Sequence, residues 1–187
     1  MIGANELKKK DTILVDGQPV IVTDVTFSSP SARGASTMVK VRVRNLLTGA
    51  VLDKNFKTAE KFDEADIETV PASFLYSDAD GFHFMDDATY EEFGLSQEKM
   101  ADLKGYLKEG VPIQALKYNG KPVSLVLPVY VELKVTSAEP GFRGDSSGSV
   151  LKQATLETGL EVRVPIYVKE GDIVRVNTQT GEVAGRA

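Results

Sequence analysis

The sequence predicts a mainly β protein made of three small β-barrel domains in tandem, an SH3-like domain followed by two OB-folds. Short β-branched or alternating runs recur along the whole chain and are separated by turn residues. Only residues 96–107 carry the apolar spacing of a helix. The composition changes near residues 57–68 and again at Pro128, so each segment has the size of a small domain. The predicted domains are residues 1–65, 66–128 and 129–187.

The first segment contains several short strand signals, which predict a small SH3-like barrel. Thr12–Val15 and Val20–Val25 are β-branched runs on either side of Asp16-Gly17, a dipeptide that strongly favours a tight hairpin. Leu47-Thr48-Gly49 marks a later turn, and Val51–Phe56 is predicted to be the strand that follows it.

Residues 40–44 alternate strictly between cations and valines. In a strand the valines would face the core, and the cations Lys40, Arg42 and Arg44 would share the opposite face. Cations two residues apart on one strand lie about 6.5–7 Å from each other, which is close to the spacing of successive phosphates. We expect these three side chains to contact an RNA backbone; a plain solvated face is the alternative.

The second segment combines strand signals with the one predicted helix. Strands are expected at Ser73–Tyr76 and Phe82–Met85, and Ile113–Tyr118 and Pro122–Leu127 flank a second hairpin signal, Asn119-Gly120. The helix is expected to start at an N-cap and to pack through one apolar face; these residues are Ser96, Met100, Leu103 and Leu107. Barrel strands interrupted by a short helix predict an OB-fold.

After Pro128 the strand signals return in a similar rhythm. Val129–Val135 alternates, a Gly/Ser-rich loop runs from Pro140 to Ser149, and strands are expected at Glu161–Val164 and Ile173–Val176. Thr180-Gly181 makes the last turn. This pattern predicts a second OB-fold.

Residues 28–36 form a long connection between the strand that ends near Phe27 and the basic strand. The connection contains no large apolar residue, so it cannot pack into a core and should project from the barrel. Arg33 is its only charge, and a guanidinium is suited to phosphate oxygens and base edges. The alternative is a surface loop without a binding role.

The composition is that of an ordinary globular protein and offers little enzyme chemistry. Of 187 residues, 42% are apolar and 26% are charged, with no cysteine and a single histidine, His83. No cysteine-based nucleophile or metal site can therefore form, and no phosphate loop or nucleophile elbow is found. His83 is expected to be structural, and Asp86-Asp87 and Glu91-Glu92 are expected to be solvated turns. We predict a protein that is not an enzyme and that uses no metal and no cofactor.

The chain carries no sign of a membrane segment. Its N-terminus is not followed by an apolar run, and no stretch approaches the roughly 18 apolar residues of a membrane span. We therefore expect a cytoplasmic protein, a monomer without membrane contact.

The charge is distributed unevenly along the chain. Residues 1–64 carry ten Lys/Arg against eight Asp/Glu, whereas residues 65–129 carry five against eleven. Six cations and one anion fall within residues 33–57. An acidic protein with one basic segment is suited to a local contact with a polyanion.

The C-terminal part of the chain resembles the signature of the elongation factor P family. The order and spacing of that signature are matched by Lys152, Ala154, Gly159, Val162, Val164, Pro165, Val168 and Gly171. Residues 45–49 and 180–182 are also similar to that family, and the resemblance covers essentially the whole chain. Residues 29–35 resemble the elongation factor P-like paralogue subgroup, because Arg33 stands at the tip of a loop one residue longer than the lysine-bearing form.

The resemblance implies an L-shaped arrangement like that of tRNA and a translation elongation factor that binds the 70S ribosome beside the peptidyl-tRNA. There it would promote peptide-bond formation at consecutive prolines. The loop that would reach the tRNA CCA end in the peptidyl-transferase centre consists of Ser29, Pro30, Ser31, Ala32, Arg33, Gly34 and Ala35. The loop that would lie near the small subunit and the exit-site mRNA codon includes Gly144, Asp145, Ser146 and Ser147. The tip of many relatives is a modified lysine; we expect Arg33 to be unmodified.

Two other functions stay open on the sequence alone. An OB-fold RNA-binding protein or RNA chaperone acting outside the peptidyl-transferase centre would need exposed aromatic side chains for base stacking. The basic first segment has only Phe27, Phe56 and Phe62, none interleaved with its cations. The second alternative is an enzyme that uses the carboxylates of the acidic middle segment.

Overall fold

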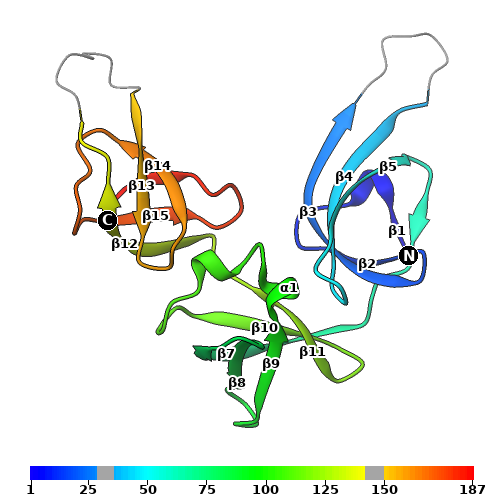
Figure 1. The fold of residues 1–187 in the computed structure, drawn as a ribbon. Coiled ribbons are helices and arrows are strands. Elements are labelled where there is room, and N and C mark those ends of the chain that lie inside the picture. The colour runs from blue at the N-terminus through cyan, green and yellow to red at the C-terminus, as the bar shows by residue number, and fades with distance from the viewer. Residues whose placement is uncertain (29–35, 142–149) are drawn as a thin grey trace.

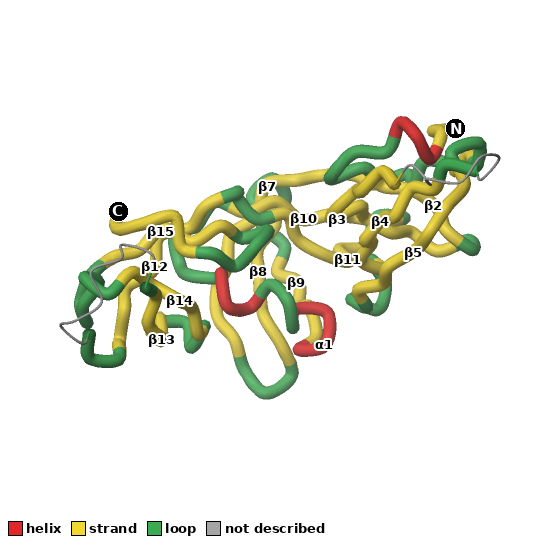
Figure 2. Tube along the Cα trace, turned by 90° about the horizontal axis from the view of Figure 1, so that it is seen from above, coloured by secondary structure: helices red, strands yellow, loops and turns green. Residues whose placement is uncertain are grey.

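The computed structural model describes residues 1–28, 36–141 and 150–187, and the predicted mainly β fold is confirmed. Three antiparallel sheets of four or five strands follow one another along the chain, beside a two-stranded sheet of β1 and β6. The molecule bends at the second large sheet, so that the other two form the arms of a V (Figure 1). Seen from above, the first and third sheets lie at opposite ends of the molecule (Figure 2). The domain boundaries themselves stay predictions.

The first sheet has the order β2-β3-β4-β5 and encloses a valine-rich core. Its strands are β2 (Thr12–Val15), β3 (Gln18–Ser28), β4 (Met38–Asn45) and β5 (Val51–Lys57). A short strand, β1 (Ile2–Gly3), pairs with β6 (Lys61–Phe62), and the one-turn helix η1 (Ala4–Glu6) lies between β1 and β2. Asp16 and Gly17 have φ of 52° and 76°, the left-handed pair that the predicted Asp-Gly hairpin requires.

The second sheet has the order β11-β10-β7-β8-β9, with a short helical segment between β9 and β10. Its strands are β7 (Ile67–Ser77), β8 (Gly81–Asp86), β9 (Glu92–Ser96), β10 (Ile113–Tyr118) and β11 (Lys121–Val126). The predicted Asn119-Gly120 hairpin joins the last two. Strand β9 was not predicted, because its acidic and glycine residues give no clear alternation.

The predicted helix is much shorter than its apolar spacing suggested. Ser96 is the N-cap, accepting a hydrogen bond from the backbone of Lys99 at 3.3 Å, but α1 (Gln97–Met100) ends after four residues. The chain then turns into the one-turn helix η2 (Lys104–Tyr106). Gly105, a poor helix former, lies so close to the third domain that an added Cβ would sit 2.9 Å from Leu160. The apolar side chains Met100, Leu103 and Leu107 are nevertheless buried, so the segment packs into the core without forming a continuous helix.

The third sheet has the order β14-β13-β12-β15-β16. Its strands are β12 (Tyr130–Ala138), β13 (Leu151–Leu156), β14 (Glu161–Pro165), β15 (Ile173–Asn177) and β16 (Val183–Arg186). The family signature maps onto this sheet as packing residues: Ala154, Val162, Val164 and Val168 are buried. Gly159 and Gly171 adopt φ of 85° and 92° at turns, so the signature specifies the core and turns of this barrel.

One turn geometry occurs in all three domains. It begins at Asn45, Asp86 and Asn177, and in each case the side-chain Oδ1 accepts the backbone N–H groups two and three residues later, at 2.8 and 3.1 Å. A threonine hydroxyl then accepts a backbone N–H two residues further on. These side chains satisfy the turn amides, which explains a polar residue at the end of each preceding strand.

The expectation that Asp86 lies in a solvated turn was therefore wrong. Its side chain is 3% exposed, and Lys117 from β10 donates to it at 2.5 Å. The turn amides and the ammonium together compensate the carboxylate for its burial.

The second domain packs against both of its neighbours. On one side Leu46, buried in the turn after β4, shares an apolar cluster with Leu116 and Val123. On the other side Tyr106 belongs to the core cluster of the third domain. Thr158 donates a hydrogen bond to the backbone oxygen of Gly105 at 2.6 Å. The bend of the molecule is thus held by buried side chains as well as by the chain connections.

Candidate nucleic-acid interface

The first candidate surface is the hairpin of β3 and β4. These strands stay paired as far as Ser28 and Met38, whereas the pairing of β3 with β2 stops at Ile21 (Figure 1). The last part of β3 is exposed, with Phe27 at 57%. Val39, opposite Phe27, is still buried in the first core, and β5 pairs with β4 as far as Met38, so the described hairpin ends at the edge of that core. The predicted tip, Ser29, Pro30, Ser31, Ala32, Arg33, Gly34 and Ala35, lies outside the described residues.

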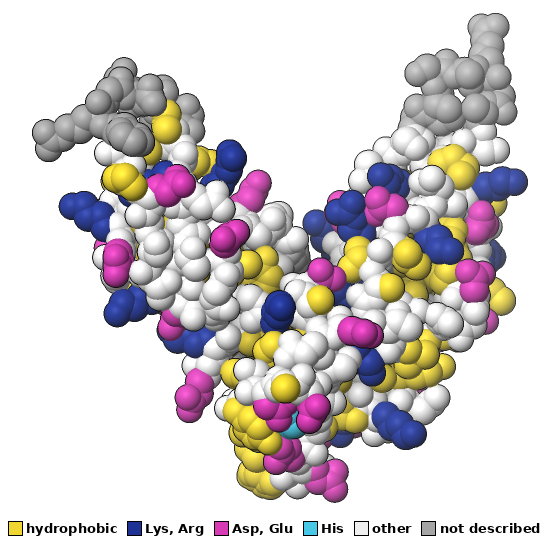
Figure 3. Space-filling model, in the orientation of Figure 1, with side chains coloured by type: hydrophobic (Ala, Val, Ile, Leu, Met, Phe, Trp, Pro, Cys, Tyr) yellow, Lys and Arg dark blue, Asp and Glu magenta, His cyan; other side chains and the backbone are white. Residues whose placement is uncertain are grey.

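Lys40 and Arg42 lie on the exposed face of β4, as the alternation predicted, and both are paired within the sheet. Arg42 donates to Asp53 of β5 at 2.8 and 3.3 Å, and Lys40 lies 3.4 Å from the same carboxylate. The hydrogen bond to Asp53 raises the pKa of Arg42, and the same bond lowers the pKa of Asp53. Cations and acids are correspondingly interspersed on both arms in Figure 3. An incoming phosphate would have to compete with Asp53 for these two side chains.

Arg44, the third cation of β4, lies in a different environment. Its side chain is 16% exposed and lies 3.7 Å from Asp102, which follows α1 in the second domain. Burial lowers the pKa of Arg44, and the charge of Asp102 only partly opposes this. The strand alternation placed Arg44 correctly on one face of β4, but it could not show that the neighbouring domain covers that end of the face.

The loop predicted to approach the exit-site codon, Gly144, Asp145, Ser146 and Ser147, also lies outside the described residues. The flanking strands β12 and β13 pair as far as Ala138 and Ala154. The contact assigned to this loop stays a prediction.

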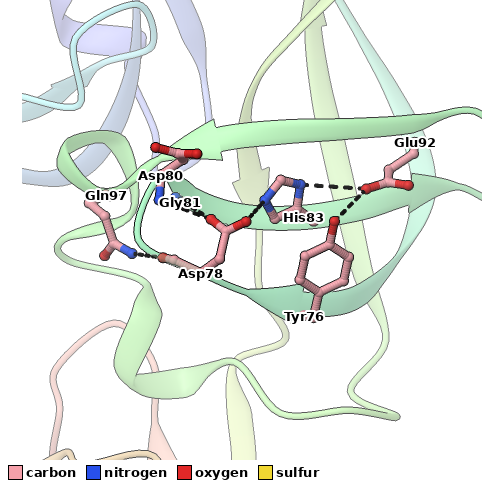
Figure 4. Close-up of polar contacts among 7 residues, drawn as sticks. All are labelled: Tyr76, Asp78, Asp80, Gly81, His83, Glu92 and Gln97. Carbon is pink, nitrogen blue, oxygen red and sulfur yellow. Dashed lines mark hydrogen bonds and ion pairs between the residues drawn. The ribbon is translucent and has the colours of Figure 1, made fainter.

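A polar cluster that the sequence did not indicate surrounds His83 at the free end of the second domain (Figure 4). The ring of His83 stacks on Tyr76 with the centroids 4.3 Å apart, and its Nε2 lies 2.9 Å from Asp78. Tyr76 donates to Glu92 at 3.1 Å, and this bond raises the pKa of the phenol. In Figure 3 the histidine lies among acidic side chains. The contacts fit the structural role expected of His83 and make this face a poor surface for phosphate.

Within the described ranges, no group of three or more His, Asp or Glu side chains is placed to hold a metal ion. In the same ranges, no helix is long and apolar enough to cross a membrane.

Three family models match successive parts of the chain. They are described as the elongation factor P KOW-like domain at residues 3–62, the elongation factor P OB domain at residues 67–125, and elongation factor P, C-terminal, at residues 131–186. The KOW-like and OB order agrees with the predicted SH3-like barrel followed by an OB-fold.

Curated relatives are similar over their full length. The elongation factor P of Thermoanaerobacter sp. (strain X514) is 41% identical over 186 residues, and that of Moorella thermoacetica is 39% identical over 187, with 100% of each chain covered. A solved structure titled eukaryotic translation initiation factor 5A from Methanococcus jannaschii aligns with a TM-score of 0.42 at 20% identity. That alignment covers 67% of this chain and 94% of the other.

Proposed function

This chain belongs to the elongation factor P family of translation elongation factors, and we propose that it binds the 70S ribosome beside the peptidyl-tRNA and promotes peptide-bond formation at consecutive prolines. The observation that supports this most directly is the pairing of β3 and β4 as far as Ser28 and Met38, the residues on either side of the proposed tip segment. Strands β3, β4 and β5 remain paired at this end of the sheet, and in the proposal the segment that follows presents one guanidinium, that of Arg33, to RNA.

In this proposal the residues 29–35 contact the CCA end of the peptidyl-tRNA, with Arg33 at the tip. Proline reacts slowly because its ring restricts the geometry of attack. A factor that holds the tRNA end in a reactive arrangement lowers an entropic barrier and needs no acid or base of its own. The ribosome performs the reaction, and no residue of this chain is assigned a catalytic role.

The remaining contacts are assigned by charge and position. Lys40 and Arg42 are exposed on β4. They are proposed to contact RNA phosphates, which would replace Asp53 as the partner of both cations. Arg44, mostly covered by the second domain, would reach only a phosphate at the domain junction. The loop of residues 144–147 is proposed to lie near the exit-site codon, and the factor to act as a monomer.

The alternative, an RNA chaperone acting outside the peptidyl-transferase centre, would bind bases on exposed aromatic rings. On the second sheet Tyr76 is half-exposed, but one face of its ring is taken by His83 and carboxylates surround it. Phe27, next to the proposed tip, is an exposed aromatic of the first domain, and it serves the proposed function equally well.

The experiment that tests the proposal is ribosome-dependent synthesis of a Pro-Pro-Pro peptide with and without this protein, beside a proline-free peptide. The protein should accelerate only the first. Arg33→Ala should lose the effect, and Arg163→Ala, which removes an exposed arginine from β14, should keep it. Equal yields with and without the wild-type protein would contradict the proposal, and full activity of Arg33→Ala would contradict the assignment of the tip.

A further inference from the structure

A cleft of about 140 Å³ lies where the three domains meet. Each domain contributes to its walls: Lys10, Ile21 and Arg44 from the first, Leu125 and Leu127 from the second, and Thr178 from the third. Sites for drug-sized ligands usually measure about 300–1,000 Å³. This cleft therefore has room for one chemical group rather than for a whole ligand of that size.

The described lining of the cleft carries only positive charge. Three cations line it, Lys9, Lys10 and Arg44, and no carboxylate belongs to the described lining. Lys9 is paired outside that lining, with its Nζ 3.2 Å from Asp24. This is unusual for a chain with a net charge of −5. Apolar side chains and the hydroxyl and amide of Thr178 and Gln179 make up most of the remaining wall. Because the Thr178 hydroxyl already donates to the backbone oxygen of Pro128 at 2.6 Å, the groups that the cleft offers to an anion are its cations and the Gln179 amide, beside apolar side chains.

Arg44 is incompletely paired at this place. Its neighbour on the same strand, Arg42, makes two hydrogen bonds to Asp53, whereas the contact of Arg44 with Asp102 is a 3.7 Å ion pair. No hydrogen bond from the Arg44 guanidinium to a described residue is found, although its side chain is only 16% exposed. Asp102 itself is half-exposed and does not line the cleft. The unbonded donors of Arg44 reach solvent, since no buried side-chain nitrogen of the described residues lacks a hydrogen-bond partner. An anion that offers several acceptor oxygens could accept from them.

The backbone at the rim is also unusual. Lys10 has a φ of 77°, a left-handed conformation that side chains with a Cβ rarely adopt, and its N–H donates to the backbone oxygen of Val22. Strained conformations of this kind persist where the surroundings hold them, often next to ligands. Here the backbone hydrogen bond to Val22 holds Lys10 in this conformation at the edge of the cleft.

We propose that this junction cleft binds a single phosphate group, with Arg44 as the principal ligand and Lys9 and Lys10 as supporting cations. Planar guanidinium groups match the geometry of phosphate oxygens, and lysines add charge without strict geometry. The phosphate comes either from an RNA backbone or from a free nucleotide. Because all three domains line the cleft, a bound phosphate would link the two arms of the molecule to the second domain. For an RNA source the inference deepens the contact assigned to Arg44 above and rests on the proposed function. Binding of inorganic phosphate is measured without ribosomes, so either proposal can fail alone.

The test is a titration of the isotope-labelled full chain with inorganic phosphate, followed by NMR at constant ionic strength. The amides of Lys10, Arg44 and Thr178 should shift together and saturate. Arg44→Gln should weaken binding about tenfold or more, as expected for the loss of a charged hydrogen-bonding group. Arg163→Gln, which removes an exposed arginine of β14 outside the cleft lining, is the matched control and should leave the affinity unchanged. Because Arg44→Gln could disturb the domain contact, Lys10→Gln provides a second variant, with an expected loss of several-fold.

Shifts that do not saturate, or equal affinities in Arg44→Gln and Arg163→Gln, would overturn the proposal. Two further ligands identify the source of the phosphate: adenosine 5′-monophosphate and a short single-stranded RNA. Tighter binding of RNA, weakened by Arg44→Gln and displaced by free phosphate, assigns the cleft to an RNA backbone. Tighter binding of the nucleotide with the same dependence on Arg44 assigns it to a free nucleotide. RNA binding that Arg44→Gln leaves unchanged lies elsewhere on the molecule and counts against the RNA source.

Discussion

Tyr90 of the second domain occupies the left-handed backbone position that Gly181 occupies in the third. Their φ angles are 61° and 75°, and each follows a threonine of the repeated turn. A residue with a Cβ pays for this conformation, whereas glycine does not. Tyr90 is 76% exposed, so its ring contributes little packing in return.

Tyr90→Gly should therefore stabilise the protein. The left-handed conformation costs a non-glycine residue about 1–2 kcal/mol, and the added freedom of glycine in the unfolded chain returns about 0.4–1 kcal/mol of that. We expect a net gain of roughly 0.5–1 kcal/mol, measured by urea denaturation. Tyr90→Ala removes the ring but keeps the Cβ, and it should give no gain. If the free energy of unfolding rose equally in both variants, loss of the ring rather than relief of backbone strain would explain the stabilisation.

Gly49→Ala should loosen the contact between the first and second domains. An added Cβ at Gly49 would lie 2.8 Å from the backbone of Lys99 in α1, so the turn or the helix must move. Gly17→Ala is the matched control, because its φ of 76° is nearly that of Gly49 at 78°, yet nothing lies within 4 Å of its added Cβ.

Both variants carry the backbone strain, and only Gly49→Ala carries the overlap, which costs about 1–3 kcal/mol more. We also expect Gly49→Ala, but not Gly17→Ala, to reduce proline-dependent peptide synthesis, because the first domain would be misdirected. Equal unfolding midpoints for the two variants would mean that the interface adapts without cost.

Local signals in the sequence were sufficient for much of the fold. Asp16-Gly17 and Asn119-Gly120 form the predicted hairpins, because two left-handed residues suffice to set the turn. The alternation in β4 buries its valines as predicted. Each of these features depends on neighbours within a few residues, so the sequence carries the whole signal.

Features that depend on distant residues could not be predicted in this way. Asp86 is buried because Lys117 reaches it from another strand, and Arg44 is covered because Asp102 and the second domain lie over it. The close approach of Gly105 in η2 to Leu160 likewise joins residues that are far apart in the sequence. The candidate site was placed by charge and by family resemblance, and neither gives the pairing of Lys40 and Arg42 with Asp53.

The ion pair of Asp86 and Lys117 should make stability depend on pH at both extremes. The hydrogen bond from Lys117 lowers the pKa of Asp86, so its contribution is complete above the ordinary value of about 3.9 and is lost as the pH falls below it. The same bond raises the pKa of Lys117, so its contribution is complete below about 10.4 and is lost as the pH rises above it.

Asp86→Asn keeps an acceptor for the turn amides but leaves Lys117 unpaired. Its urea midpoint should be lower than that of the wild type at pH 7, and the gap should narrow below pH about 4, where the wild-type carboxylate is being protonated. A gap that stays constant from neutral to acidic pH would show that the carboxylate charge is not responsible.

Ribosome binding should depend on salt through Lys40 and Arg42. Replacing both by glutamine should weaken binding and reduce the slope of log affinity against log salt by roughly two units, one for each phosphate contact. Asp53→Asn is the opposite test, because it releases both cations from their partner. It should strengthen binding at low salt. If neither variant changes the affinity or the slope, this face of β4 is merely solvated.

Arg33 should act without covalent modification. Two devices can bring a cation to the end of a tRNA: a longer side chain, as in the modified lysine of many relatives, or a longer loop. The sequence resemblance implies a loop one residue longer than the lysine-bearing form, and one residue adds up to about 3.3–3.6 Å of reach when extended. Pro30 limits the entropy that the loop loses on ordering, and a guanidinium already supplies five donors and a permanent charge.

Intact-mass spectrometry of protein from its native host should give the mass of the unmodified chain, and recombinant protein should be fully active in Pro-Pro-Pro synthesis. A mass increment on Arg33, together with inactive recombinant protein, would instead show that the longer loop alone is not enough.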